Sequence, residues 1–177
     1  MRLSMTPTTL LTARLRLRPL DVGDLEEMKA LVADACVRRF LFENQKLACE
    51  DIREMLEIGA RDFDESGIGL WGIHVADQDA LIGFFQLWPF HIVWPLHDDQ
   101  ATECSFALHP RYRGNGYAYE AGVAMIEHVR SLGLKFLRAS TDVCNGPCIR
   151  MLSRLEFTES AIVSGPLGPL RVFKLAL

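Results

Sequence analysis

The segment from Thr102 to Leu132 constrains the fold most, because it joins a strand to a long helix through a short basic turn. Residues 102–108 alternate, with the apolar Cys104, Phe106 and Leu108 on one face and Glu103, Ser105 and Ala107 on the other. This alternation is typical of a strand with one buried face. Glu103 lies on the face opposite Cys104, so its carboxylate is expected to project away from the apolar side. The helix has its expected buried stripe at Tyr117, Ala121, Met125, Val129 and Leu132.

The rest of the chain continues this mixture of strand and helix patterns. Arginines at positions 14, 16 and 18 alternate with leucines, which predicts a first strand with its arginines in water. Asp24 is a candidate N-cap for the helix that follows, whereas residues 38–47 show no clear pattern. Further strands are expected at 71–75, 81–85, 135–141, 162–163 and 172–177, and helices at 24–32, 52–63 and 145–155. This order of elements predicts an α/β (α+β) domain on a mixed sheet.

Length and composition indicate one folded domain that spans residues 1–177. Of these 177 residues, 49% are hydrophobic and 24% are charged, which is enough apolar material for a core. The formal net charge of −4 disfavours the basic surface of a nucleic-acid-binding domain. Residues 1–9 lack the apolar stretch of a signal peptide, and no membrane-spanning stretch is found. We therefore expect a soluble, cytoplasmic protein with neither a nucleic acid nor a membrane as partner.

The five cysteines indicate reduced thiols. An odd number without a secretory context is usual in a reducing compartment. Cys144 and Cys148 are spaced C-x-x-x-C instead of C-x-x-C, and His91 and His97 complete no known ligand pattern with them. No metal is expected.

The turn that precedes the long helix has the features of an anion-binding site. Gly114 and Gly116 let the backbone approach an anion, and the first N–H groups of the helix lie at the positive end of its dipole. A pyrophosphate fits this description, and a plain tight turn is the alternative. Two nucleotide motifs fail: Tyr117 and Ala118 stand where a Walker A loop needs Lys-Ser/Thr, and Tyr119 stands where a dinucleotide motif needs a third glycine.

Four motifs, in the correct order, resemble the GNAT superfamily of acetyl-CoA-dependent N-acetyltransferases over nearly the full chain. Residues 111–116 are similar to its pyrophosphate motif Arg-x-x-Gly-x-Gly, and Glu103 is similar to the glutamate of its fourth strand. Residues 11–20 resemble the opening strand of the ribosomal-protein N-terminal acetyltransferase branch. The same branch has a Gly-Tyr-Ala-x-Glu-Ala run, similar to residues 116–121, and an Asn-x-x-Ser-x-x-x-Leu-x-x-x-Gly-Phe stretch, similar to residues 145–157.

Three positions depart from the family pattern. Arg113 replaces the usual aromatic residue before the first glycine and adds a cation near the phosphates. Cys148 replaces the usual serine after the asparagine, a change that touches the mechanism. Glu156 replaces a glycine at a helix end, where only local structure is concerned.

The resemblance implies a sheet of about seven strands, mostly antiparallel, with helices on both faces and a splayed fourth and fifth strand. The pantetheine arm of coenzyme A lies between the splayed strands in this family. The resemblance therefore implies an acyltransferase that uses acetyl-CoA. The cofactor-binding residues it implies are Phe106, Ala107, Leu108, Arg111, Arg113, Gly114, Asn115, Gly116, Tyr117, Ala118, Asn145 and Cys148.

The resemblance also implies direct attack of a primary amine on the acetyl group through a tetrahedral intermediate, with a backbone N–H stabilising the oxyanion. Glu103 is the candidate base, acting through a water, and a solvated strand glutamate is the alternative. Cys148 is the candidate acid for the CoA thiolate, and packing beside CoA is the alternative. Tyr117 and Tyr119 are competing candidates for this acid.

Two segments near these residues have more than one interpretation. Pro147 favours the first helical position, which makes Gly146 the cap and leaves the Asn145 amide free for pantetheine, but a plain turn asparagine is the alternative. The predicted loop 88–100 forms an acceptor wall, a dimer contact or a self-packed loop. Its aromatic and histidine residues are Trp88, Phe90, His91, Trp94 and His97.

Three functions remain open at this stage. The first is an N-acetyltransferase that acts on a protein N-terminus or a small-molecule amine, as a monomer or homodimer. The second is a non-catalytic acyl-CoA-binding module, and the third is a domain for another phosphate ligand. Glu103 favours the first function over the second, because binding alone does not require a base.

Overall fold

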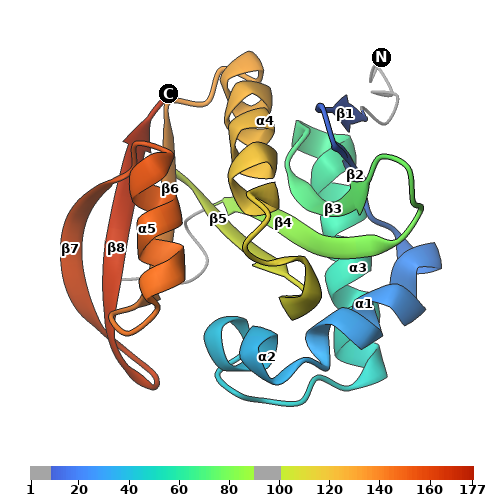
Figure 1. Ribbon diagram of the computed structural model, residues 1–177, viewed down its shortest axis with the longest axis horizontal. Helices are drawn as coiled ribbons and strands as arrows, with labels where there is room; N and C mark the ends of the chain where they lie inside the picture. Colours follow the sequence, from blue (N-terminus) through green and yellow to red (C-terminus); the bar gives the residue numbers. More distant parts are fainter. Residues whose placement is uncertain (1–8, 90–100) are drawn as a thin grey trace.

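A mixed sheet forms the centre of the molecule, with helices on both of its faces (Figure 1). The computed structural model describes residues 9–89 and 101–177. The strand order is β1-β2-β3-β4-β5-β6-β8-β7, and all neighbours are antiparallel except β5 and β6. The strands are β1 Leu10–Leu11, β2 Leu15–Pro19, β3 Gly69–Val75, β4 Leu81–Pro89, β5 Ala101–Leu108, β6 Phe136–Asp142, β7 Thr158–Gly165 and β8 Gly168–Ala176. The predicted fold class is confirmed.

Alternating strand residues build a core on each face of the sheet. On one face, α4 and α5 cover buried residues such as Leu17 and Leu87, and on the other face α1, α2 and α3 cover Leu70 and Phe84. The helices are α1 Leu25–Val32, α2 Ala35–Leu41, α3 Cys49–Ser66, α4 Tyr117–Ser131 and α5 Gly146–Arg154. Both cores come from the period-two alternation that the sequence shows, because successive strand side chains point to opposite faces.

The parallel pair β5 and β6 splays apart after a short contact. Among the described residues, the two strands pair at Ala101–Phe136, Thr102–Leu137 and Glu103–Arg138. Beyond Glu103, β5 continues to Leu108 paired with β4 on its other side. One edge of β5 is therefore open next to β6, as predicted for the fourth and fifth strands. They are numbered β5 and β6 here because the short β1 adds an eighth strand to the sheet.

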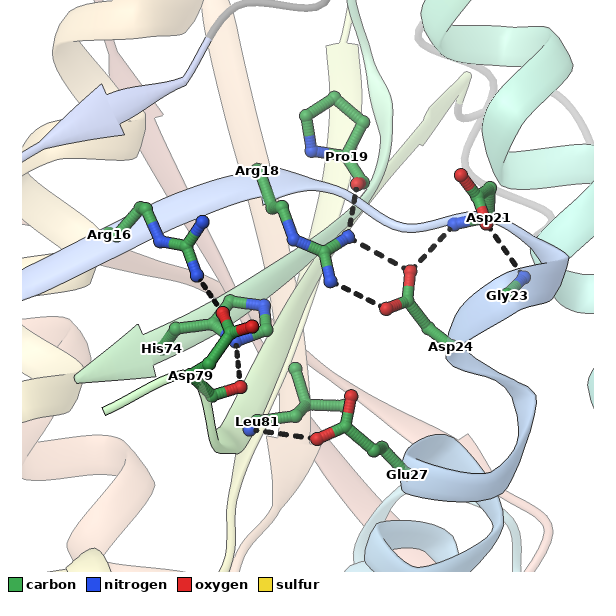
Figure 2. Close-up of polar contacts among 10 residues, drawn as sticks. All are labelled: Arg16, Arg18, Pro19, Asp21, Gly23, Asp24, Glu27, His74, Asp79 and Leu81. Atoms are coloured by element: carbon green, nitrogen blue, oxygen red, sulfur yellow. Dashed lines mark hydrogen bonds and ion pairs between the residues drawn. The ribbon is translucent and has the colours of Figure 1, made fainter. Parts of the chain in front are cut away.

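The predicted capping role of Asp24 is wrong. Asp24 stands at the N-cap position of α1, but its carboxylate makes no capping hydrogen bond there. Figure 2 shows that it binds the guanidinium of Arg18 on β2, with Nη2 to Oδ1 at 2.6 Å and Nη1 to Oδ2 at 3.0 Å. Asp21 instead caps the short 3-10 turn before α1 by accepting from the Gly23 amide. Arg18 is thus half-buried, although its position in the alternation predicted a side chain in water.

Helix α2 was not predicted, because it is too short to show helical periodicity. The Asp34 carboxylate caps it by accepting from the amides of Cys36 and Val37. Of the seven residues of α2, Val37 is the buried one, so the helix has one core position and its sequence shows no repeat. The helix lies over β5 and contributes to the site described below.

The predicted loop 88–100 is described in part. Trp88 belongs to β4, which ends at Pro89, and Phe90, His91, Trp94 and His97 lie outside the described residues, as do residues 1–8. Within the described ranges, none of the helices combines the length and apolar character that crossing a bilayer requires. The same part of the chain holds no group of three or more histidine, cysteine or acidic residues placed to bind a metal ion.

Candidate active site

Two adjoining cavities open where β5 and β6 diverge. The large cavity, about 740 Å³, is lined by the glycine turn and the first turns of α4 and α5. The small cavity, about 240 Å³, lies between α2, the splayed strands and the β7–β8 hairpin. Their shared lining residues are Phe40, Leu41, Cys104, Ser105, Ala139, Ser140 and Thr141. Because five of these residues come from the two splayed strands, the two cavities meet at the splay.

The glycine turn leaves space for an anion at the end of the large cavity. Gly114 and Gly116 have φ values of 79° and 80°, which strongly favour glycine. A Cβ at Gly114 would meet nothing within 4 Å, and one at Gly116 would lie 3.5 Å from Arg14 Nη2. Gly116 is the N-cap of α4 and makes no side-chain cap, so the first N–H groups of this 15-residue helix are available to a ligand. The residues present therefore fit a pyrophosphate.

A carboxylate beside this turn is neutralised within the protein. Glu120 lies in the first turn of α4, where Arg14 Nη2 is 2.6 Å from its Oε2 and Thr12 Oγ1 donates to its Oε1 at 2.5 Å. Burial alone would raise the pKa of Glu120, but the hydrogen bonds from Thr12 and Arg14 outweigh it and lower the pKa. Arg14 also donates to the Asn115 carbonyl at 3.0 Å, so this cluster holds the turn in place without leaving a free negative charge.

Most of the implied cofactor residues lie on the large cavity. Arg111 and Asn115 are the exceptions, because they belong to the turn but do not line the cavity. Asn115 instead donates to the carbonyls of Tyr112 and Arg113. The implied residues that line the cavity are Phe106, Ala107, Leu108, Arg113, Gly114, Gly116, Tyr117, Ala118, Asn145 and Cys148, and the competing acid Tyr119 lies there too.

The structure also places two cationic residues there that sequence reasoning missed. Arg150 and Arg154 of α5 line the large cavity one helical turn apart. The Arg154 guanidinium lies 4.4 Å from the centre of the Tyr119 ring. Their four-residue spacing within the predicted helix 145–155 is a signal that could have found them, because such residues share a helix face.

The Asn145 amide is engaged within the protein, which corrects one interpretation of this residue. Asn145, not Gly146, is the N-cap of α5, and its Oδ1 accepts from the Cys148 amide at 3.4 Å. Its Nδ2 donates to Thr141 Oγ1 at 3.1 Å. Pro147 therefore takes the second helical position, which is tolerated because the missing N–H would have no partner within the helix.

Glu103 lies on the wall of the small cavity, close to the splay. Its register partners are Trp88 on β4 and Arg138 on β6. Burial raises the pKa of Glu103, and the hydrogen bond from Ser140 Oγ to Oε1 at 3.1 Å and the charge of Arg138 only partly oppose this. A carboxylate with a raised pKa is a stronger proton acceptor, so the environment suits a base.

Cys148 lies in the first turn of α5, on the large cavity. Burial raises the pKa of its thiol, and a hydrogen bond with Thr141 offsets part of this effect. The thiol is therefore protonated at neutral pH and has a proton to give. Cys104 lines both cavities, and after burial the charges of Glu103 and Cys148 also raise its pKa, so Cys104 lies within electrostatic reach of both groups.

An open strand edge between two cavities, with a glycine turn that fits an anion at one end and a carboxylate at the other, is an arrangement that suits acyl transfer from a phosphate-bearing cofactor. Residues 14–158 match the acetyltransferase (GNAT) domain model, and the chain belongs to this family of acetyl-CoA-dependent acyltransferases. The family resemblance stated from the motifs is thereby confirmed.

Several solved structures share this fold. The GNAT-family acetyltransferase from Bacillus anthracis superposes with a TM-score of 0.78 at 16% identity, covering 96% of this chain and 98% of that one. RimL, a ribosomal L7/L12 α-N-protein acetyltransferase in complex with coenzyme A, gives 0.78 at 14% identity, covering 96% and 98%. AAC(6′)-Ib in complex with paromomycin and acetyl-CoA gives 0.76 at 15% identity, covering 92% and 93%. No curated protein matches the chain in sequence.

Proposed function

We propose that this acetyltransferase moves the acetyl group of acetyl-CoA to a primary amine, on a protein N-terminus or a small molecule. The observation that supports this most is that the two cavities meet at the splay. The large cavity carries the anion-binding turn, and the small cavity carries the Glu103 carboxylate. An amine in the small cavity therefore reaches the splay from the side opposite the glycine turn.

The residues of the large cavity fit acetyl-CoA. The first N–H groups of α4, beside Gly114 and Gly116, would hold the pyrophosphate. The open edge of β5 would hold the pantetheine arm through main-chain hydrogen bonds, as it would hold an added strand. Arg150 and Arg154 add positive charge to the same cavity. When bound, acetyl-CoA supplies the acetyl group as a thioester.

Glu103 takes the proton that an ammonium group must lose before its nitrogen can attack. Its carboxylate accepts the proton directly or through a water. At pH 7, deprotonating an α-amine with a pKa of about 8 costs about 1.4 kcal/mol, whereas a lysine with a pKa of about 10.4 costs about 4.6 kcal/mol. One carboxylate therefore serves an α-amine more easily than a lysine.

Cys148 gives the proton that the departing sulfur needs. Its S–H is a weak donor, but burial keeps it protonated and α5 presents it to the large cavity. Tyr119 lines the same cavity and is the competing donor.

The test is a CoA-release assay with a panel of amines, comparing the wild type with Glu103→Gln. We expect Glu103→Gln to lower turnover at pH 7 by roughly a hundredfold or more, because it removes the proton acceptor. The loss should shrink as pH rises and more of the amine is already deprotonated. Affinity for acetyl-CoA, measured by calorimetry, should stay unchanged. Glu127→Gln on the exposed part of α4 is the matched control.

Two outcomes would contradict the proposal. An unchanged rate of the Glu103→Gln variant at pH 7 would show that Glu103 is a solvated strand glutamate and not the base. Tight acetyl-CoA binding with no amine acetylated would favour the non-catalytic acyl-CoA-binding module.

A further inference from the structure

Apolar side chains line much of the small cavity that holds Glu103. The β6–β8–β7 register places Val172 opposite Ser140, and Leu170 opposite both Asp142 and Val163. These three apolar residues line the cavity on the hairpin side. Phe40 and Leu41 of α2 and Trp88 of β4 line it elsewhere. An acceptor whose amine reaches Glu103 therefore places its neighbouring group against hydrocarbon.

The charges around the cavity nearly balance. Three carboxylates line it, those of Glu43, Glu103 and Asp142, together with the guanidinium groups of Arg39 and Arg138. Arg138 is the register partner of Glu103 and stabilises its charged form. Arg39 lies with its guanidinium carbon 5.4 Å from the centre of the Phe40 ring. A single ammonium group can lie at Glu103, whereas further ammonium groups would meet Arg39 and Arg138 as well as Glu43 and Asp142 and so gain little net attraction.

The cavity is also small. At about 240 Å³ it lies below the range of roughly 300–1,000 Å³ that encloses drug-sized ligands. By itself this volume accommodates an amine and one group about the size of an amino-acid side chain.

From these three observations we infer that the small cavity selects acceptors with one ammonium group next to one apolar group the size of a leucine or phenylalanine side chain. This inference rests on the proposed function and names its substrate class. Two kinds of acceptor share this chemistry. One is a polypeptide whose first residue is apolar, and the other is a free arylalkylamine.

The first experiment compares acceptors with the wild-type protein and saturating acetyl-CoA. One arm uses peptides that differ only in their first residue: leucine, phenylalanine, serine or lysine. The other arm uses phenethylamine, ethanolamine and spermidine. We expect kcat/KM for the apolar members to exceed that of the polar members by roughly tenfold or more in at least one arm, because burying the apolar group stabilises the bound acceptor. The arm that shows the preference identifies the source of the acceptor.

The second experiment changes the wall of the cavity. Val163→Asp should raise KM for apolar amines by roughly tenfold or more and lift the relative rate with spermidine. Val163→Thr, which keeps the side-chain volume, should shift selectivity in the same direction but less. The control is Ile162→Asn, because Ile162 is 59% exposed, adjacent in β7 and not among the cavity-lining residues. Acetyl-CoA affinity should stay unchanged in all three variants.

The outcomes separate this inference from the proposed function. Equal or higher kcat/KM for the polar members in both arms would overturn the inference and leave amine acetylation intact. Unaltered selectivity in both folded Val163 variants would do the same. Failure to acetylate any amine, with acetyl-CoA still bound, would overturn both.

Discussion

At the scale of single residues, the site depends on groups whose protonation the fold has shifted. Glu103 becomes a stronger base because burial disfavours its charged form, while the Ser140 hydroxyl and Arg138 keep it ionisable. The thiol of Cys148 becomes a weaker acid because it too is buried. The shift at Glu103 runs in the direction that its proposed role requires, whereas the shift at Cys148 keeps the thiol protonated but makes it a weaker donor.

The Ser140 hydroxyl should set the pH at which Glu103 becomes active. Ser140→Ala removes a hydrogen bond that stabilises the carboxylate, so the pKa of Glu103 should rise further. The acidic limb of the kcat/KM profile should then move to higher pH, with the rate at high pH retained. Ser105→Ala, which removes a hydroxyl that lines the same two cavities, is the control. A profile unchanged by Ser140→Ala would show that Glu103 does not control this limb.

Cys148 is tested by comparing two variants in single-turnover experiments. If its S–H protonates the departing sulfur, Cys148→Ala should slow the chemical step by roughly tenfold or more, and Cys148→Ser should keep most of the rate. Single-turnover rates are needed because steady-state rates can report product release. A wild-type rate in Cys148→Ala would assign the proton to Tyr119 or to water.

At the scale of elements, the glycine turn and the open edge of β5 together form the proposed cofactor site. The turn is conformationally costly for other residues, because Gly114 and Gly116 both have positive φ. It is held from outside by Arg14, which joins the segment before β2 to Asn115 and Glu120. Contacts between distant segments therefore hold the proposed anion-binding turn in its conformation.

Gly114→Ala and Gly133→Ala separate backbone strain from cofactor binding. Both glycines have positive φ, 79° and 77°, and an added Cβ at either meets nothing within 4 Å. Each variant should therefore lose a similar free energy of unfolding, about 1–2 kcal/mol. Only Gly114 lines the large cavity, so Gly114→Ala alone should weaken acetyl-CoA binding, by roughly tenfold, in calorimetry. Equal weakening in both variants would attribute the effect to strain.

At the scale of the whole molecule, a polar cluster fixes α1 and the β3–β4 turn against the N-terminal half of the sheet. His74 on β3 is fully buried, with its Nδ1 3.3 Å from the Asp79 carbonyl (Figure 2). Burial and then the charge of Arg18 lower the pKa of His74, while the Asp79 carbonyl and Glu27 partly oppose this. Arg18 itself pairs with Asp24, so the cluster contains both signs of charge.

This histidine should make the fold less stable in mild acid. Because the folded pKa lies below the ordinary value of 6.5, the unfolded chain takes up the proton first as pH falls. The contribution of His74 to the free energy of unfolding is fully present above about pH 6.5 and declines as the pH falls below that value. Each kcal/mol lost should lower the Tm by about 2–4 °C for a chain of this size. His74→Leu should flatten the dependence of Tm on pH between 7 and 5; a slope equal to that of the wild type would contradict this.

Much of the fold followed from local patterns in the sequence. The alternation at Leu15 and Leu17 and the helical spacing along α3 and α4 indicate which face of each element is buried. Local sequence is enough for this because apolar side chains are the ones that leave water. The glycine turn and Glu103 were also visible, because a strand of known phase fixes which way a side chain projects. The short helix α2 was not predicted, because a single buried residue does not produce a helical period in the sequence.

The tertiary structure alone decided which distant residues meet. Asp24 occupies the N-cap position of α1, but its carboxylate binds Arg18 instead of capping the helix, because β2 brings the guanidinium next to it. Asn145 became the cap of α5, and Arg150 and Arg154 reached the large cavity, because α5 docks against the end of β6. The small cavity exists because α2 and the β7–β8 hairpin enclose the splay. Such contacts depend on the register of the strands and on where they diverge. The local sequence around a residue does not determine either of these.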